Sequence, residues 1–115
     1  MAQPNAIRNQ AARKLGLLGV GQTLQSEIST DLDQAYIEVF NALDAMNQAP
    51  WDVDDDVPDE YVPFLAALVA DKRLVDYKTP PERLALIKAE ASDAWGAIRE
   101  LNGSDLTEVV YTDYF

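Results

Sequence analysis

Apolar residues recur every three or four positions in four stretches of the chain, and this is the period of an amphipathic α-helix. The first stretch predicts a short helix over Asn5–Leu15 that ends at Gly16. A connecting loop over residues 16–28 follows, and its glycines suit a connection between helices. The apolar stripe that we expect this helix to bury consists of Ile7, Ala11, Ala12 and Leu15.

The second stretch predicts a longer helix, which begins after a cap at Ser29 or Thr30 and ends near Asn47, before Pro50. An acidic loop over residues 51–58 follows, and Trp51 is expected to fix this loop to the core. The expected core face of the second helix is the stripe Leu32, Tyr36, Val39, Phe40, Leu43 and Met46.

The third predicted helix begins at Pro58-Asp59, with Pro63 tolerated in its first turn. Its residues at helical spacing are Val62, Leu65, Ala66, Val69 and Arg73. The fourth begins at Thr79-Pro80-Pro81-Glu82, where Thr79 is the expected N-cap and Glu82 completes a capping box. Asn102-Gly103 is expected to end it. The apolar stripe of this helix consists of Leu84, Ile87, Ala91, Ala94, Trp95, Ile98 and Leu101.

The end of the chain is unusually apolar. Residues 108–115 hold three of the ten aromatic residues, and their strand-like composition favours an extended arm. A soluble domain rarely leaves such a surface free, so we expect the arm to pack on its own bundle or on a neighbouring subunit. The residues expected to make this protein contact are Val109, Val110, Tyr111, Tyr114 and Phe115.

These elements together predict an all-α fold. Residues 1–103 are expected to form a small four-helix bundle, and residues 104–115 a short extended C-terminal docking arm. A length of 115 residues fits one domain with a modest core.

The composition argues against catalysis. The chain has neither cysteine nor histidine, which removes thiolate chemistry and the commonest general base and metal ligand. No isolated pair of acids lies on an apolar helix face, where a general acid and base would be expected. We therefore expect no enzyme, no cofactor and no metal site. No segment approaches the about 20 apolar residues of a membrane span, and no signal-peptide pattern opens the chain.

The charge is large and unevenly spread. A net charge of −11 argues against binding to nucleic acid through phosphate neutralisation. Residues 1–26 carry three bases and no acid, whereas residues 27–60 carry eleven acids and no base. Such segregation is typical of a solvated acidic face, and it also suits head-to-tail contacts between identical copies. The densest acidic cluster consists of Asp52, Asp54, Asp55, Asp56, Asp59 and Glu60.

Two stretches come close to ligand-binding motifs. Gly16–Thr23 resembles a phosphate-binding loop, but Gln22 replaces the lysine and the segment follows a helix where the motif requires a strand. Asp52–Asp56 resembles the start of a calcium-binding loop, but Val57 stands where the turn needs glycine and Pro63 where a glutamate should bind. The ordinary interpretations, a helix connector and a solvated loop, are preferred.

The ordered set of elements resembles the head-to-tail adaptor, or connector, proteins of tailed bacteriophages. The resemblance covers most of the chain. It rests on Ala11–Gly16, on Asp33–Met46 with Trp51, on Val57–Ala70, on the Pro-Glu-Arg-Leu start of an alanine-rich helix that ends at Arg99–Asn102, and on the Tyr114-Phe115 end.

The resemblance implies a non-enzymatic virion component at the head–tail junction, made in the host bacterial cytoplasm. Such adaptors are helical bundles that form a dodecameric ring beneath the portal protein, extend the DNA channel and receive the next tail or nozzle protein. Their C-terminal arm reaches the portal or a neighbouring subunit, and this implies the docking role for Val109, Val110, Tyr111, Tyr114 and Phe115. As a hypothesis, the acidic cluster faces the channel and repels the passing DNA, which is not bound specifically.

Two other classes stay open. One is an acidic DNA mimic, or another acidic interaction module, that occupies a basic cleft; it needs acids in rows over several elements, whereas here eleven acids crowd into residues 27–60. The other is a carboxylate hydrolase, for which the chain offers no constellation.

Overall fold

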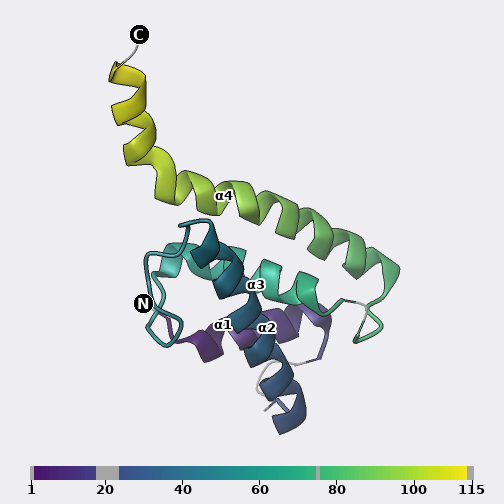
Figure 1. The fold of residues 1–115 in the computed structure, drawn as a ribbon. Coiled ribbons are helices and arrows are strands. Elements are labelled where there is room, and N and C mark those ends of the chain that lie inside the picture. The colour runs from purple at the N-terminus through teal and green to yellow at the C-terminus, as the bar shows by residue number, and fades with distance from the viewer. Residues whose placement is uncertain (1, 18–23, 75, 114–115) are drawn as a thin grey trace.

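The all-α prediction is confirmed. The computed structural model describes residues 2–17, 24–74 and 76–113, with side chains described through residue 102 (Figure 1). Within these ranges the chain forms four α-helices, Pro4–Leu15 (α1), Ser26–Ala45 (α2), Val62–Lys72 (α3) and Pro81–Asp113 (α4), and a 3-10 turn, Asp59–Tyr61 (η1), but no strand. The arrangement is a small helical bundle.

Helix α3 is the centre of the bundle. It packs against α1, α2 and α4, and it is the most apolar of the helices. A helix that is apolar on every side must be buried, and its alanines allow neighbouring helices to approach closely. Pro63 lies in its first turn, as expected, and η1 forms the start that was predicted at Pro58-Asp59. The buried residues of α3 are Val62, Leu65, Ala66, Ala67, Leu68, Val69 and Ala70.

Helix α1 matches its prediction closely. The predicted stripe of Ile7, Ala11, Ala12 and Leu15 is the set that α1 buries. Gly16 ends the helix in the left-handed conformation, with φ of 80°, which a residue with a side chain rarely adopts. A Cβ there would lie 3.1 Å from the guanidinium of Arg83, which is the end of an exposed side chain and can move, so the backbone conformation is what requires glycine.

Helix α2 begins earlier than predicted, at Ser26. Thr30 is not its cap, because the Thr30 hydroxyl donates to the Ser26 carbonyl at 2.9 Å inside the helix. Of the predicted core stripe, the five residues from Leu32 to Leu43 are buried. Met46 was wrongly included: the helix ends at Ala45, and Met46 is 48% exposed beyond the last turn.

Helix α4 buries Ile87, Ala91, Ala94 and Ile98, as predicted. Trp95 is only half-buried, and Leu101 is 41% exposed. Thr79 is not the N-cap, since Pro80 intervenes before the helix. Its hydroxyl donates instead to the Leu74 carbonyl at 3.1 Å and closes the turn between α3 and α4.

The predicted stop at Asn102-Gly103 and the extended arm were wrong. Helix α4 continues through Gly103 to Asp113, and its last turns project beyond the rest of the bundle (Figure 1). One glycine costs a helix only about 1 kcal/mol relative to alanine, which weakens a helix without ending it. The last buried residue among the described side chains of α4 is Ile98, so the packed part of the helix lies before the predicted boundary at residue 103.

Candidate functional site: the acidic end of the bundle

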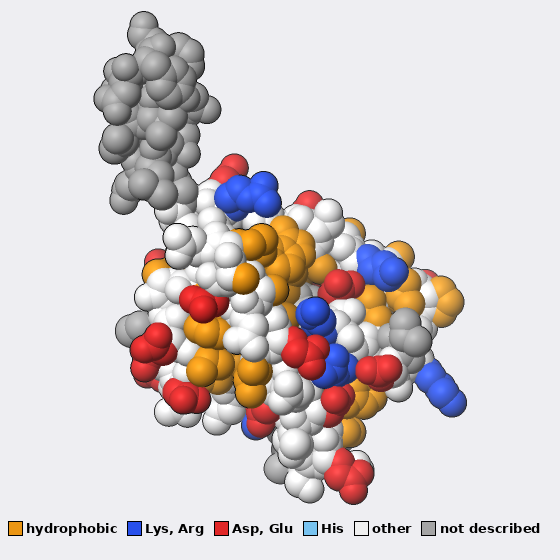
Figure 2. Space-filling model, viewed as in Figure 1, with side chains coloured by type: hydrophobic (Ala, Val, Ile, Leu, Met, Phe, Trp, Pro, Cys, Tyr) orange, Lys and Arg blue, Asp and Glu red, His pale blue; other side chains and the backbone are white. Residues whose placement is uncertain are grey.

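The six residues of the predicted acidic cluster lie together between α2 and α3. Asp52, Asp54, Asp55 and Asp56 are in the loop, while Asp59 and Glu60 are in η1, and all six are exposed. Figure 2 shows acidic side chains on this part of the surface, at the left of the body. We call this surface the acidic end.

The loop that carries these acids is anchored to the core. Trp51 is 7% exposed, and its indole Nε1 donates to the Tyr36 hydroxyl at 3.2 Å. The Trp51 ring also meets the Tyr61 ring, with centroids 4.8 Å apart. Burial raises the pKa of both tyrosines, and the charge of Glu60 adds to the effect on Tyr61. The predicted anchoring role of Trp51 is confirmed.

A second attachment pairs the loop with the start of the chain. Val57 is fully buried, and its amide donates to the Ala2 carbonyl at 2.7 Å, while the Ala2 amide donates to the Val57 carbonyl at 2.8 Å. This antiparallel bridge attaches the loop near its C-terminal end, whereas Trp51 attaches it at its N-terminal end. The loop that carries the exposed aspartates is therefore attached to the bundle at both Trp51 and Val57.

Asn102 joins the acidic end to α4. The Tyr61 hydroxyl donates to Asn102 Oδ1 at 2.6 Å, and Asn102 Nδ2 donates to the carbonyl of Gln48 at 2.6 Å and to its side-chain oxygen at 3.1 Å. Asn102 is the last residue before Gly103, so this clamp fixes α4 at the point where its projecting part begins. No local pattern indicates this clamp, because Asn102 and Tyr61 are 41 residues apart in the chain.

The two predicted sites consequently converge. The acidic cluster and the root of the C-terminal segment lie at the same end of the bundle, linked through Asn102. Val109, Val110 and Tyr111 belong to the last turns of α4, and Tyr114 and Phe115 lie outside the described residues. What the structure brings together is thus the acidic loop and the base of the segment that bears the predicted docking residues.

The structure describes the calcium-loop-like stretch in full and the phosphate-loop-like stretch only in part. The acidic loop borders an open hollow lined by Trp51, three aspartates and two prolines. Among the described residues, no group of three or more acids is arranged to hold a metal ion. Gly16 ends α1, as the connector interpretation expects, and the rest of the phosphate-loop-like stretch, residues 18–23, lies outside the described residues.

The bases near the start of the chain are partly used inside the bundle. Arg8 pairs with Asp33 of α2 at 3.2 Å, and Lys14 pairs with Glu90 of α4 at 2.9 Å. Arg13 is exposed at the end of α1. The segregation of charge along the sequence is therefore reduced in the folded chain, except at the acidic end.

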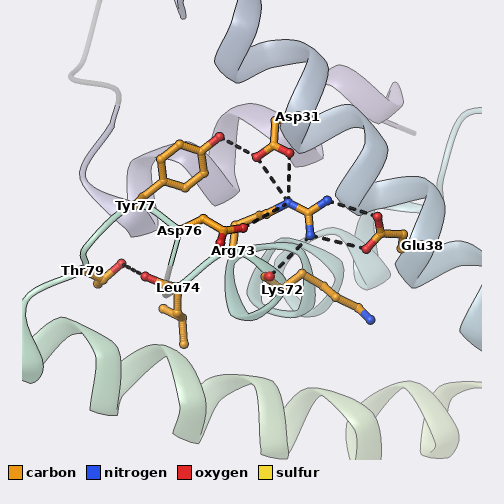
Figure 3. A network of polar contacts seen from close by, with 8 residues as sticks. All are labelled: Asp31, Glu38, Lys72, Arg73, Leu74, Asp76, Tyr77 and Thr79. Carbon is orange, nitrogen blue, oxygen red and sulfur yellow. Dashed lines mark hydrogen bonds and ion pairs between the residues drawn. The ribbon is translucent and has the colours of Figure 1, made fainter.

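A second polar cluster surrounds Arg73 (Figure 3). Its Nε donates to both Asp31 oxygens at 3.1 and 3.2 Å, and its Nη2 donates to Glu38 at 3.1 Å. The Tyr77 hydroxyl donates to Asp31 at 2.6 Å. Arg73 thus binds acids of α2 and Asp76 after α3, so the cluster holds α2 against the turn after α3.

This cluster predicts an alkaline limit to stability. The pKa of Tyr77 is raised from 10.0 to about 12, mainly by burial and secondly by the hydrogen bond to Asp31. The folded chain therefore keeps this proton between pH 10 and about 12, while the unfolded chain loses it. Stability should be unaffected by this group below pH 10 and should fall as the pH rises toward 12.

Urea unfolding at about pH 9 and about pH 11 tests this expectation. The loss of stability between the two conditions should be smaller in Tyr77→Phe than in the unaltered chain. Part of the loss should persist, because the pKa values of Tyr36 and Tyr61 are raised too. An equal loss in both proteins would contradict the role of Tyr77.

Comparison with family models, with curated proteins and with solved structures finds no match to this chain. In the part of the chain that the structure describes, no helix is long and apolar enough to cross a membrane.

Proposed function

We propose that this chain is a structural virion protein, a head-to-tail adaptor that forms a ring beneath the portal of a tailed bacteriophage. The observation that carries the proposal is the convergence at one end of the bundle. An exposed acidic loop and the root of a projecting helix are joined there through Tyr61 and Asn102. A ring component needs both a surface toward the channel and a segment that reaches out of its own fold.

In this proposal the two parts have different roles. The acidic cluster faces the channel and repels the phosphates of passing DNA. The ring in this way extends the DNA channel without binding the DNA. The C-terminal segment, with Val109, Val110 and Tyr111, docks on the portal or on a neighbouring subunit. Twelve copies form the ring, and its other side receives the next tail or nozzle protein. The role is non-enzymatic and requires no cofactor.

Electron microscopy of the chain produced together with the portal protein of the same phage tests the proposal. The expected result is a ring bound to the portal, with the loop over residues 51–60 toward the channel. A chain truncated after Asn102 should keep a cooperative unfolding transition, because the described core ends at Ile98. It should lose portal binding and the helical signal of the removed turns.

Two results would count against this function. Absence of portal binding by the full chain would exclude the adaptor role, and a loop on the outside of the ring would exclude the channel role of the acids. Loss of folding on truncation would show instead that the C-terminal segment belongs to the core.

The exposed acids support a second candidate, an acidic DNA mimic or other acidic interaction module. The four exposed acids of the loop and the two of η1 can enter a basic cleft. A strict monomer that binds a nuclease in competition with DNA, and that ignores the portal, would favour this candidate. Asn substitution of the aspartates in the loop would then abolish nuclease binding, whereas an adaptor with the same changes should still bind the portal.

A further inference from the structure

Asn102 is the one asparagine of the chain that precedes a glycine. The chain has five asparagines, and the other four precede alanine or glutamine. Asparagine is among the thermally labile residues, because the next backbone nitrogen can attack its side-chain carbonyl. A following glycine favours this attack, since it has no Cβ to block the approach and its backbone rotates freely. The pair Asn102-Gly103 is therefore the place in this sequence where deamidation is chemically easiest.

The fold holds both polar atoms of the Asn102 amide. Its Oδ1 accepts from the Tyr61 hydroxyl at 2.6 Å, and its Nδ2 donates to the Gln48 carbonyl at 2.6 Å and to the Gln48 side-chain oxygen at 3.1 Å. Gln48 is itself fixed, because its amide donates to the Leu43 carbonyl at 2.8 Å at the end of α2. Asn102 therefore ties α4 both to η1 and to the end of α2.

The backbone at this pair is also held in an unreactive form. Helix α4 continues through Gly103 (Figure 1), so the Gly103 amide belongs to the hydrogen-bond ladder of the helix. Ring closure needs a backbone angle at Asn102 that differs from the helical one, so that the nitrogen can meet the side-chain carbon. The reaction consequently requires that both the clamp and this turn of α4 open.

We propose that Asn102 is a deamidation site and that its clamp to Tyr61 and Gln48 sets the rate. On opening, the Gly103 nitrogen forms a bond to Asn102 Cγ, the bond from Cγ to Nδ2 breaks, and the Gly103 proton passes through water to the leaving group, which departs as ammonia. Water then opens the resulting succinimide ring and leaves aspartate or isoaspartate at position 102. Only this chain and solvent water take part, so the site does not depend on the proposed function.

The product cannot rebuild the clamp. An aspartate at position 102 still accepts from the Tyr61 hydroxyl, but its second oxygen takes the place of Nδ2 and faces the carbonyl oxygen of Gln48. Gln48 can turn its side-chain amide to donate, whereas its backbone carbonyl is held at the end of α2. In isoaspartate the main chain gains a methylene group, which interrupts the helical ladder. Deamidation thus releases the last turns of α4 from the acidic end irreversibly.

Peptide mass spectrometry of the full chain during incubation in mildly alkaline buffer measures the reaction at each asparagine. In guanidinium chloride, where the chain is unfolded, Asn102 should convert before the other four. In the folded chain it should convert at least about tenfold more slowly, because opening breaks the hydrogen bonds of the clamp. Equal rates at Asn102 in the folded and unfolded chains, or no preference for Asn102 in guanidinium chloride, would overturn the inference.

Tyr61→Phe tests the clamp itself, because it removes the hydroxyl that binds Asn102 and keeps the ring beside Trp51. It should raise the rate at Asn102 in the folded chain by about fivefold and leave the rate in guanidinium chloride unchanged. The matched control is Tyr36→Phe, which removes the hydroxyl that accepts from Trp51 in the same aromatic cluster. Equal acceleration by both variants would show that the reaction follows unfolding of the whole chain, and the role of the clamp would be lost.

Asn102→Asp reproduces one product and tests the release of α4. Amide hydrogen exchange in α4 after Ile98 should become about tenfold faster, while exchange in α3 should stay the same. Asn41→Asp is the matched control, because Asn41 is exposed on α2 and the change adds the same charge. Unchanged exchange in Asn102→Asp, or equal acceleration in Asn41→Asp, would contradict the release of α4 by deamidation.

Discussion

Replacing Leu65 with alanine is expected to lower the free energy of unfolding by about 3 kcal/mol. Leu65 is fully buried in α3, the helix that packs against α1, α2 and α4. The loss combines the transfer of the removed methyl groups with the cavity that they leave. Its neighbours Ala66 and Ala70 are too small to fill that cavity, and three helices hold its walls apart.

Urea denaturation followed by circular dichroism measures this effect. Leu86→Ala is the matched control, because it removes the same atoms from a residue that is 61% exposed, and it should change the stability of the monomer by less than about 0.5 kcal/mol. Similar losses in the two variants would show that α3 is not the centre of the core.

Replacing Arg73 with methionine is expected to lower the free energy of unfolding by about 2 kcal/mol. The Arg73 side chain is 13% exposed and binds both Asp31 and Glu38, which would be left without their cation. Breaking a fully buried ion pair costs more than this, but both acids are 39% exposed, so water screens part of the loss. Methionine keeps most of the apolar contact of the arginine stem.

This effect should depend on pH in a definite direction. The hydrogen bond from Arg73 lowers the pKa of Glu38 below its ordinary value of 4.5. A lowered pKa means that the interaction stabilises the fold above pH 4.5 and is lost as the pH falls through the lower value in the folded chain. The stabilities of the unaltered chain and Arg73→Met should therefore approach each other in acid.

Lys72→Met provides the control, because Lys72 is exposed next to Arg73 and its charge lowers the pKa of Glu38 only as a smaller cause than Arg73 (Figure 3). It should change stability by less than about 0.5 kcal/mol. A difference between Arg73→Met and the unaltered chain that stays constant down to low pH would assign the loss to packing rather than to the ion pairs.

The relation between sequence and structure differs from helix to helix. The stripe of α1 and its end at Gly16 followed from the sequence, because a short helix with one apolar face can bury only that face. The expected burial of Met46 and Leu101 was wrong. Both residues keep the helical period, but Met46 lies beyond the end of α2, and Leu101 lies beyond Ile98, the last buried residue among the described side chains of α4.

The polar sites could not be found in the sequence. Arg73 fitted the helical period of α3, and Asn102 looked like a helix stop. Their partners, Asp31 and Tyr61, are 42 and 41 residues away, and no local pattern encodes contacts at that separation. The Asn102 clamp also holds the turn before Gly103, which helps to explain why α4 continues where the local signal predicted an end.

By itself, the sequence determined that this protein is an all-α bundle with an acidic loop and an apolar C-terminal end, because helical periodicity and composition are local properties. Only the tertiary structure decided that the acidic loop and the root of the C-terminal segment share one end, and that the exposed Leu86 lies toward the other. Those relations depend on how helices distant in sequence pack around α3.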